Sequence, residues 1–179
     1  MIHDRELLDH LDGLPKAVFD GQVFRATRQN LDPLASSSSG GRWMPNGGAG
    51  VLYTSLQREG ALAEISFHWS QMNPRPTKPV MVHSLGVIAH RTLKLVRTDL
   101  SALGVFEDAY IGVNLRRTQE IGAAVEFLGC DGLIAPSARW DCDNLMLFTD
   151  NLSDSASLEL LSSENIDWIA WATDQKLLK

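Results

Sequence analysis

The order of the apolar segments is the feature that most limits the fold of this chain. Segments with helical periodicity lie at residues 4–11, 57–69 and 118–128, whereas runs typical of strands lie at 18–19, 23–27, 51–55, 80–89, 93–96, 132–136, 145–148 and 166–172. Residues 100–113 fit neither pattern. Strands follow strands here instead of alternating with helices, so the pattern disfavours a doubly wound parallel sheet. We predict an α+β fold with a bent, largely antiparallel sheet and flanking helices.

Length and charge narrow the class of protein. With 179 residues, 44% of them hydrophobic, the chain is expected to form a single domain over 1–179. A net charge of −6 argues against a general nucleic-acid binder, and the acidic part is 150–179, where six acids face two bases. The sequence has no apolar run of about 18 residues and no recognisable signal segment, so we expect a cytoplasmic protein without a membrane span. It has no CxxC or HExxH motif, and we expect no metal site.

A long loop at residues 31–50 contains a serine and glycine run at 36–41. Such a run is often a linker between domains, but too few residues precede it to form one. Long loops inside compact domains are more often functional. Arg25, Arg28 and Arg42 lie in or beside this loop, and guanidinium groups bind phosphate well. All three could instead be solvated surface arginines; Arg42 fits that alternative least, because glycines and Trp43 flank it.

Three further residues are candidates for a binding or catalytic site. Glu64 lies among small and apolar residues, so its carboxylate must be paired with a cation or lie in a cleft. Tyr53 lies in an apolar strand, where packing in the core is the ordinary role. Ser137 follows a strand end, where a serine hydroxyl ordinarily stabilises a turn. The GxGxxG and GxxxxGK[ST] motifs are absent, so any bound phosphate needs another way of being held.

Four motifs in order resemble the RES domain, a family named for its arginine, glutamate and serine. They are GGRW-x-P-x-G at 40–47, VLYTS at 51–55, ALAE at 61–64, and DGLIAPSAR at 131–139 with NLMLF at 144–148. The resemblance covers residues 24–148, and Met44 replaces the asparagine expected after the tryptophan. It implies a fold like that of the ADP-ribosyltransferase toxins, NAD⁺ as the substrate, and the role of toxin in a bacterial toxin–antitoxin pair with an Xre-like DNA-binding antitoxin. The residues that match the family's site are Arg25, Arg42, Tyr53, Glu64 and Ser137.

The chemistry of NAD⁺ cleavage gives each of these residues a role. Breaking the nicotinamide–ribose bond passes through an oxocarbenium-like state, and the cationic leaving group needs no general acid, so one carboxylate is enough. We expect Glu64 to bind the ribose hydroxyls and stabilise the developing charge. Arg42 and Arg25 would hold the pyrophosphate, Tyr53 would stack on nicotinamide, and Ser137 would orient the amide or the ribose.

The acceptor of ADP-ribose stays open at this point. Water or phosphate as acceptor makes the protein an NAD⁺-depleting toxin, which is the leading hypothesis, and a host protein side chain makes it an ADP-ribosyltransferase. A non-catalytic nucleotide- or protein-binding module is the alternative from another class.

Overall fold

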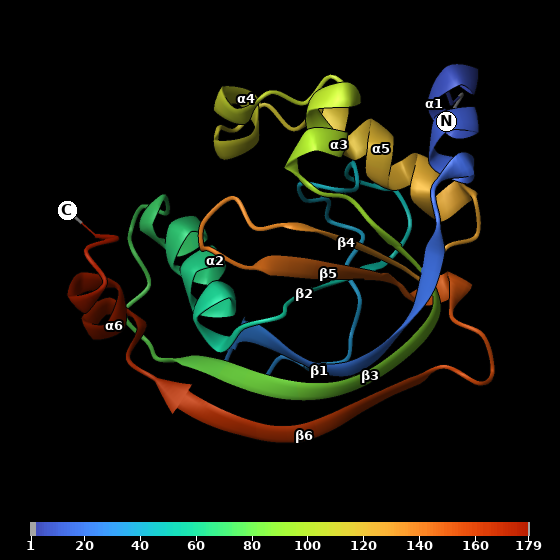
Figure 1. The fold of residues 1–179 in the computed structure, drawn as a ribbon. Helices are drawn as coiled ribbons and strands as arrows, with labels where there is room; N and C mark the ends of the chain where they lie inside the picture. Colours follow the sequence, from blue (N-terminus) through green and yellow to red (C-terminus); the bar gives the residue numbers. More distant parts are fainter. Residues whose placement is uncertain (1–2, 179) are drawn as a thin grey trace.

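The computed structural model describes residues 3–178, which form one six-stranded sheet and six α-helices (Figure 1). The strands are β1 (Lys16–Arg28), β2 (Val51–Ser55), β3 (Val80–Lys94), β4 (Gly132–Pro136), β5 (Asp143–Phe148) and β6 (Ser157–Ile166). The helices are α1 (Arg5–Gly13), α2 (Arg58–Ser70), α3 (Arg97–Ala102), α4 (Glu107–Ile111), α5 (Arg116–Phe127) and α6 (Trp168–Asp174), and a 3₁₀ turn follows β5 at Thr149–Asn151. None of the helices described within residues 3–178 is long and apolar enough to cross a bilayer.

The sheet bends back on itself. Its strand order is β1-β2-β5-β4-β3-β6, and β1 pairs with β3 as well, so five strands form a closed ring of pairings. Every pairing is antiparallel except that of β3 with β4. In Figure 1 the long strands β1, β3 and β6 curve beneath β2, β5 and β4. The predicted α+β class with a bent, largely antiparallel sheet is therefore confirmed.

In two places, two strands predicted as separate segments belong to one continuous strand in the structure. Segments 18–19 and 23–27 both belong to β1, and segments 80–89 and 93–96 fall on β3 and its end. The backbones of β1 and β3 stay paired from Lys16 with Leu93 to Arg28 with Val80, with an irregularity between Ala17 and Phe19. Polar residues inside these strands do not end them, because backbone hydrogen bonds hold the pairing there.

The prediction at the C-terminal end was wrong. Residues 166–172 are not a strand: most of them belong to α6, which Asp167 caps by accepting hydrogen bonds from the backbone N–H groups of Ile169 and Ala170 at 3.1 and 3.0 Å. Trp168 and Ala172 lie on the buried face of this helix. The last strand is β6, which the prediction missed because most of its side chains are exposed and its leucines do not alternate. The ambiguous region 100–113 forms the end of α3 and the short helix α4.

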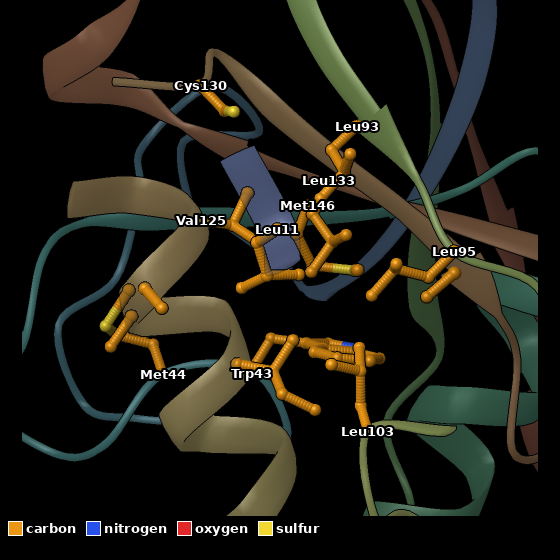
Figure 2. Close-up of a cluster of buried hydrophobic side chains, with 14 of the residues drawn as sticks. Leu11, Trp43, Met44, Leu93, Leu95, Leu103, Val125, Cys130, Leu133 and Met146 are labelled. Carbon is orange, nitrogen blue, oxygen red and sulfur yellow. The ribbon is translucent and has the colours of Figure 1, made fainter. Parts of the chain in front are cut away.

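The largest core cluster anchors the loop at 31–50. Trp43 and Met44 are each 2% exposed and pack with Leu11 of α1, Val125 of α5 and apolar residues of the sheet (Figure 2). A second cluster joins β1 and β3 to β2 and β5, and a third lies between α2, α6 and the ends of β1 and β3. The residues beside Arg42 are therefore core residues, which fixes the base of the loop.

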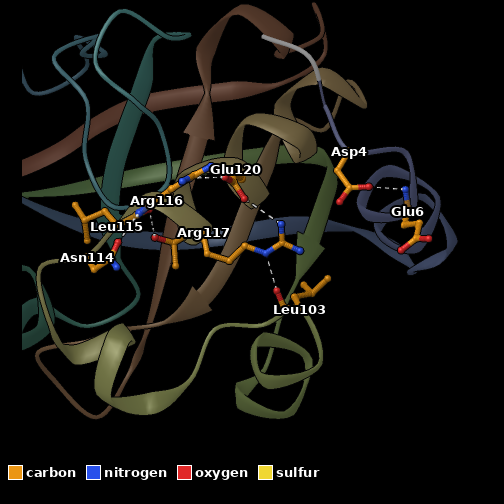
Figure 3. A network of polar contacts seen from close by, with 9 residues as sticks. Asp4, Glu6, Leu103, Asn114, Leu115, Arg116, Arg117 and Glu120 are labelled. Atoms are coloured by element: carbon orange, nitrogen blue, oxygen red, sulfur yellow. Dashed lines mark hydrogen bonds and ion pairs between the residues drawn. The ribbon is translucent and has the colours of Figure 1, made fainter.

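An arginine on α5 ties the helix to the end of α3. Arg117 donates from Nε to the carbonyl of Leu103 at 2.8 Å and from Nη1 to Glu120 at 3.0 Å, and Arg116 also pairs with Glu120 (Figure 3). These contacts bracket α4, which lies between α3 and α5 in the chain. The contact between Leu103 and Arg117 thus joins the two ends of the segment that contains α4.

Candidate active site

Helix α2 brings Glu64 to the ends of two neighbouring strands. Oε1 of Glu64 accepts hydrogen bonds from Oγ of Ser137 at 2.8 Å and from Nδ2 of Asn144 at 2.9 Å. Because β4 and β5 are antiparallel with Ala135 opposite Asn144, Ser137 lies just beyond the same edge as Asn144. The carboxylate is half-buried and its position is set by two donors from the sheet.

Ser137 is itself fixed by the turn that follows β4. The residue is 2% exposed; its Oγ accepts hydrogen bonds from the backbone N–H groups of Arg139 and Trp140 at 3.1 and 3.3 Å. Its own N–H donates to the carbonyl of Cys142 at 2.7 Å. The Ser137 hydroxyl therefore stabilises its turn and also donates to Glu64. The turn keeps the hydroxyl pointed at the carboxylate.

Arg42 lies on a loop that is packed closely against α5. A Cβ added at Gly122 would come within 1.8 Å of the carbonyl oxygen of Trp43, and Gln119 donates to the carbonyl of Gly41 at 2.9 Å. The Arg42 guanidinium donates to the carbonyls of Tyr110 and Gly112 at 2.5 and 3.5 Å, and its Cζ lies 5.0 Å from the centre of the Tyr110 ring. Arg42 is half-buried and held in place, unlike a solvated surface arginine.

Tyr53 lies under the same loop. Its hydroxyl accepts a hydrogen bond from the backbone N–H of Trp43 at 3.3 Å, and a Cβ added at Gly41 would come within 2.7 Å of its ring. Burial raises the pKa of Tyr53 to about 12, against the opposing effect of the backbone N–H groups of Trp43 and Met44 and of the charge of Arg42. Tyr53 thus supports the Arg42 loop, and its stacking on nicotinamide stays a prediction.

Arg25 binds backbone carbonyls at the start of the loop at 31–50. Its Nη1 donates to the carbonyls of Pro33 and Ala35, both at 2.8 Å, which ties β1 to the start of the loop. Burial lowers the pKa of Arg25, and nearby Asp32 opposes that shift. Within residues 3–178 no hydrogen bond joins Arg25 to Glu64 or Arg42. Arg28 is exposed.

Four residues near this site were not singled out from the sequence. Asn144 donates to Glu64, and Tyr110 donates from its hydroxyl to the carbonyl of Pro136. The Tyr110 ring lies within 5.0 Å of Arg42 Cζ and within 4.7 Å of Arg97 Cζ, and burial raises the Tyr110 pKa. Arg97 donates to the carbonyl of Ser137 at 3.1 Å, and Arg139 donates to the carbonyl of Ile111 at 2.7 Å and lies over the Phe67 ring of α2. Arg139 and Asn144 lie inside the motifs at 131–139 and 144–148, so these motifs could have identified both residues as candidates.

An open cleft of about 470 Å³ lies next to Ser137. Its walls come from the start of α2, the turn between β4 and β5, and α3, and they consist of Leu56, Gln57, Arg97, Pro136, Ser137, Trp140, Asp141, Cys142 and Asp143. Glu64 and Arg42 do not line this cleft. Ser137 therefore stands between the cleft and the Glu64 carboxylate.

Both the sequence and the fold of this chain resemble those of known proteins. The profile of the RES domain matches residues 22–169. No curated protein sequence gives a significant match. Among solved structures, the crystal structure of the M. tuberculosis MbcT–MbcA toxin–antitoxin complex contains a chain with a TM-score of 0.80 and 18% identity, over 95% of this chain and 97% of that chain. At this identity the likeness shows the fold, and the profile match over most of the chain shows that this protein belongs to the RES domain family.

Proposed function

We propose that this protein cleaves NAD⁺ between nicotinamide and ribose and passes ADP-ribose to water or phosphate, acting as the toxin of a toxin–antitoxin pair. The observation that carries the proposal is the Glu64 carboxylate, which Ser137 and Asn144 hold by one oxygen. Family membership and the fold shared with MbcT support it, since the solved structure of that protein is a toxin–antitoxin complex.

The carboxylate is arranged to meet a developing positive charge. Both hydrogen bonds end on Oε1, and within residues 3–178 Oε2 accepts none. Oε2 would take the ribose hydroxyls, and the negative charge would stabilise the oxocarbenium-like state as nicotinamide departs with the bonding electron pair. Oδ1 of Asn144 is buried without a hydrogen bond, so the site keeps an unsatisfied acceptor while the amide donates to Glu64.

The cationic side of the site would bind the pyrophosphate. Tyr110 links Arg42 to the turn that holds Glu64: its ring centre lies 5.0 Å from Arg42 Cζ, and its hydroxyl donates to the carbonyl of Pro136, next to Ser137. A guanidinium in this place would fix the ribose while the glycosidic bond lengthens. Arg25 would add to this binding only after releasing the carbonyls of Pro33 and Ala35. Tyr53 would contribute its ring to the nicotinamide, and Ser137 would act through Glu64 and on the ribose or the amide.

The decisive test is release of free nicotinamide from NAD⁺ by the purified protein. Wild type is expected to release it, and Glu64→Gln to lose about a hundredfold or more in kcat while staying folded. Glu59→Gln, the same change on the same helix at a surface ion pair with Arg58, is the matched control and should keep wild-type turnover. Absence of nicotinamide release by wild type would favour a non-catalytic binding module.

Product analysis identifies the acceptor. ADP-ribose indicates transfer to water, a phosphorylated ADP-ribose appearing only with added phosphate indicates phosphorolysis, and labelled protein in a lysate indicates an ADP-ribosyltransferase. A toxin of this kind would act in the cytoplasm, where NAD⁺ lies, and would need a neutralising partner, for which we propose an Xre-like antitoxin. Expression of the chain alone should arrest growth, and expression with its antitoxin should restore it.

A further inference from the structure

Two arginines from distant parts of the chain bind three successive backbone carbonyls at the end of α4. Arg42 donates to the carbonyls of Tyr110 and Gly112, and Arg139 donates from Nη1 to the carbonyl of Ile111, at 2.7 Å. The segment 110–112 thus lies between two guanidinium groups. One of them belongs to the loop at 31–50 and the other to the turn after β4.

Arg139 has no counterion within the described part of the chain. The ion pairs found among residues 3–178 include Arg58, Arg97, Arg116 and Arg117, but neither Arg42 nor Arg139. Arg139 is half-buried, and its Cζ lies 3.4 Å from the centre of the Phe67 ring on α2. Burial and the charge of Arg42 lower the pKa of Arg139, while Glu64 raises it. Two like charges are therefore held close together without a carboxylate bound to either.

Carbonyl oxygens are weak partners for such a pair. A carbonyl carries only a partial negative charge, whereas phosphate oxygens carry full charge and match the guanidinium fork in bidentate fashion. The donors that now face the carbonyls of residues 110–112 are the donors that a phosphate group needs. Ile111 and Val113, which follow the buried anchor Tyr110, are 47% and 83% exposed, so little packing opposes a movement of these residues.

We infer that Arg139 is a second phosphate-binding residue of this site. When a nucleoside diphosphate binds, its phosphate oxygens replace the carbonyl of Ile111 as the acceptor for the Arg139 guanidinium. The inference rests on the proposed function, which supplies a ligand with a pyrophosphate. Arg42 and Arg139 would then hold the pyrophosphate from two sides, and release of the carbonyls would loosen the segment at 107–113. The alternative is that Arg139 only anchors this segment to the turn after β4.

The affinity for ADP-ribose shows whether Arg139 binds phosphate or only anchors the segment to the turn after β4. By titration calorimetry, Arg139→Gln should weaken ADP-ribose binding about ten- to hundredfold, which is the range for losing a charge-assisted hydrogen bond. Arg139→Lys should weaken it less, because it keeps the charge without the fork. Arg116→Gln is the matched control, since Arg116 is an exposed partner of Glu120 on α5. Adenosine, which has no phosphate, should bind all four proteins with one affinity.

Hydrogen exchange of wild type gives a second readout that needs no variant. Amides at 107–113 should exchange faster when ADP-ribose is bound, because the carbonyls of the segment lose their arginine donors. Exchange that is unchanged or slower would overturn the displacement of the segment. Equal ADP-ribose affinity of Arg139→Gln and Arg116→Gln would overturn the phosphate-binding role.

The outcome for the proposed function is read separately, from nicotinamide release by wild type. If nicotinamide is released and Arg139→Gln binds ADP-ribose normally, the inference fails while the proposed function stands. If wild type does not bind ADP-ribose at all, the inference fails whatever the nicotinamide assay gives. A folded state for each variant is checked by its thermal transition.

Discussion

The Ser137 hydroxyl and the Glu64 carboxylate are joined by a 2.8 Å hydrogen bond although 73 residues separate them in the sequence. The bond links the start of the turn after β4 to the middle of α2. Since Ser137 also accepts two backbone hydrogen bonds from its own turn, the carboxylate is positioned by the sheet and not only by its helix.

Replacing Ser137 by alanine should lower turnover without abolishing it. Glu64 keeps the hydrogen bond from Asn144, so we expect kcat for nicotinamide release to fall about tenfold, well short of the loss in Glu64→Gln. Two backbone N–H groups of the turn lose their acceptor, and the free energy of unfolding should fall by about 1–3 kcal/mol. A loss in kcat as large as that of Glu64→Gln would mean that Ser137 itself touches the reacting atoms.

Substitutions at Tyr53 separate its ring from its hydroxyl. Tyr53→Phe keeps the ring and removes the acceptor for the N–H of Trp43, so it should cost about 1–2 kcal/mol of stability and leave KM for NAD⁺ unchanged. Tyr53→Leu removes the ring and should raise KM as well. If both variants keep the wild-type KM, the ring has only a packing role. Initial-rate kinetics and urea unfolding measure the two effects.

Gly122 should not tolerate even a methyl group. A Cβ there would overlap the carbonyl oxygen of Trp43, so Gly122→Ala should push the Arg42 loop off α5 and cost about 3 kcal/mol, the upper end for overpacking. At Gly13 an added Cβ meets nothing within 4 Å, so Gly13→Ala is the matched control and should change stability little. Urea unfolding of both variants tests the difference; equal stabilities would contradict the close packing.

Stability should fall as the solution is acidified below neutral pH because of His83. Its imidazole is buried between the hydroxyls of Thr27 and Ser163, and burial, together with the charge of Arg25, lowers its pKa from 6.5. The unfolded chain therefore takes up the proton first: the contribution of His83 to stability is complete above pH 6.5 and is lost as the pH falls toward the lowered value of the folded state. Unfolding midpoints of wild type and His83→Gln between pH 8 and 5 should converge at low pH. If the midpoints of the two proteins change with pH in parallel, His83 is not the cause of the pH dependence.

Much of the architecture follows from local pattern. The helix expected at 4–11 exists because Asp4 caps it and Leu7 and Leu11 share its buried face, and strands 51–55 and 132–136 have the predicted bounds. The error at 166–172 arose because an apolar run with two tryptophans suits either a buried strand or a helix, and only the capping role of Asp167 separates them. β6 forms because β3 offers it a partner, which its own residues do not reveal.

The site was less predictable than the fold. Family resemblance pointed to Glu64 and Ser137, and the structure brings these two together, but it uses Arg25 to tie β1 to a loop. The contacts of Tyr110 and Arg139 depend on where the 104–115 segment folds over the sheet. Such long-range placement leaves no local periodicity in the sequence.

The closed ring of strand pairings has a consequence for how the chain reaches its native state. β1 pairs with β3 some distance along the chain, and β5, which joins the ring through β2 and β4, ends only at Phe148. Chains dominated by such non-local contacts fold slowly, because distant segments must meet before any pairing is gained. Glu64 meets Ser137 and Asn144 only when α2 packs beside β4 and β5, so a chain in which these distant segments have not yet met carries the Glu64 carboxylate without its two donors.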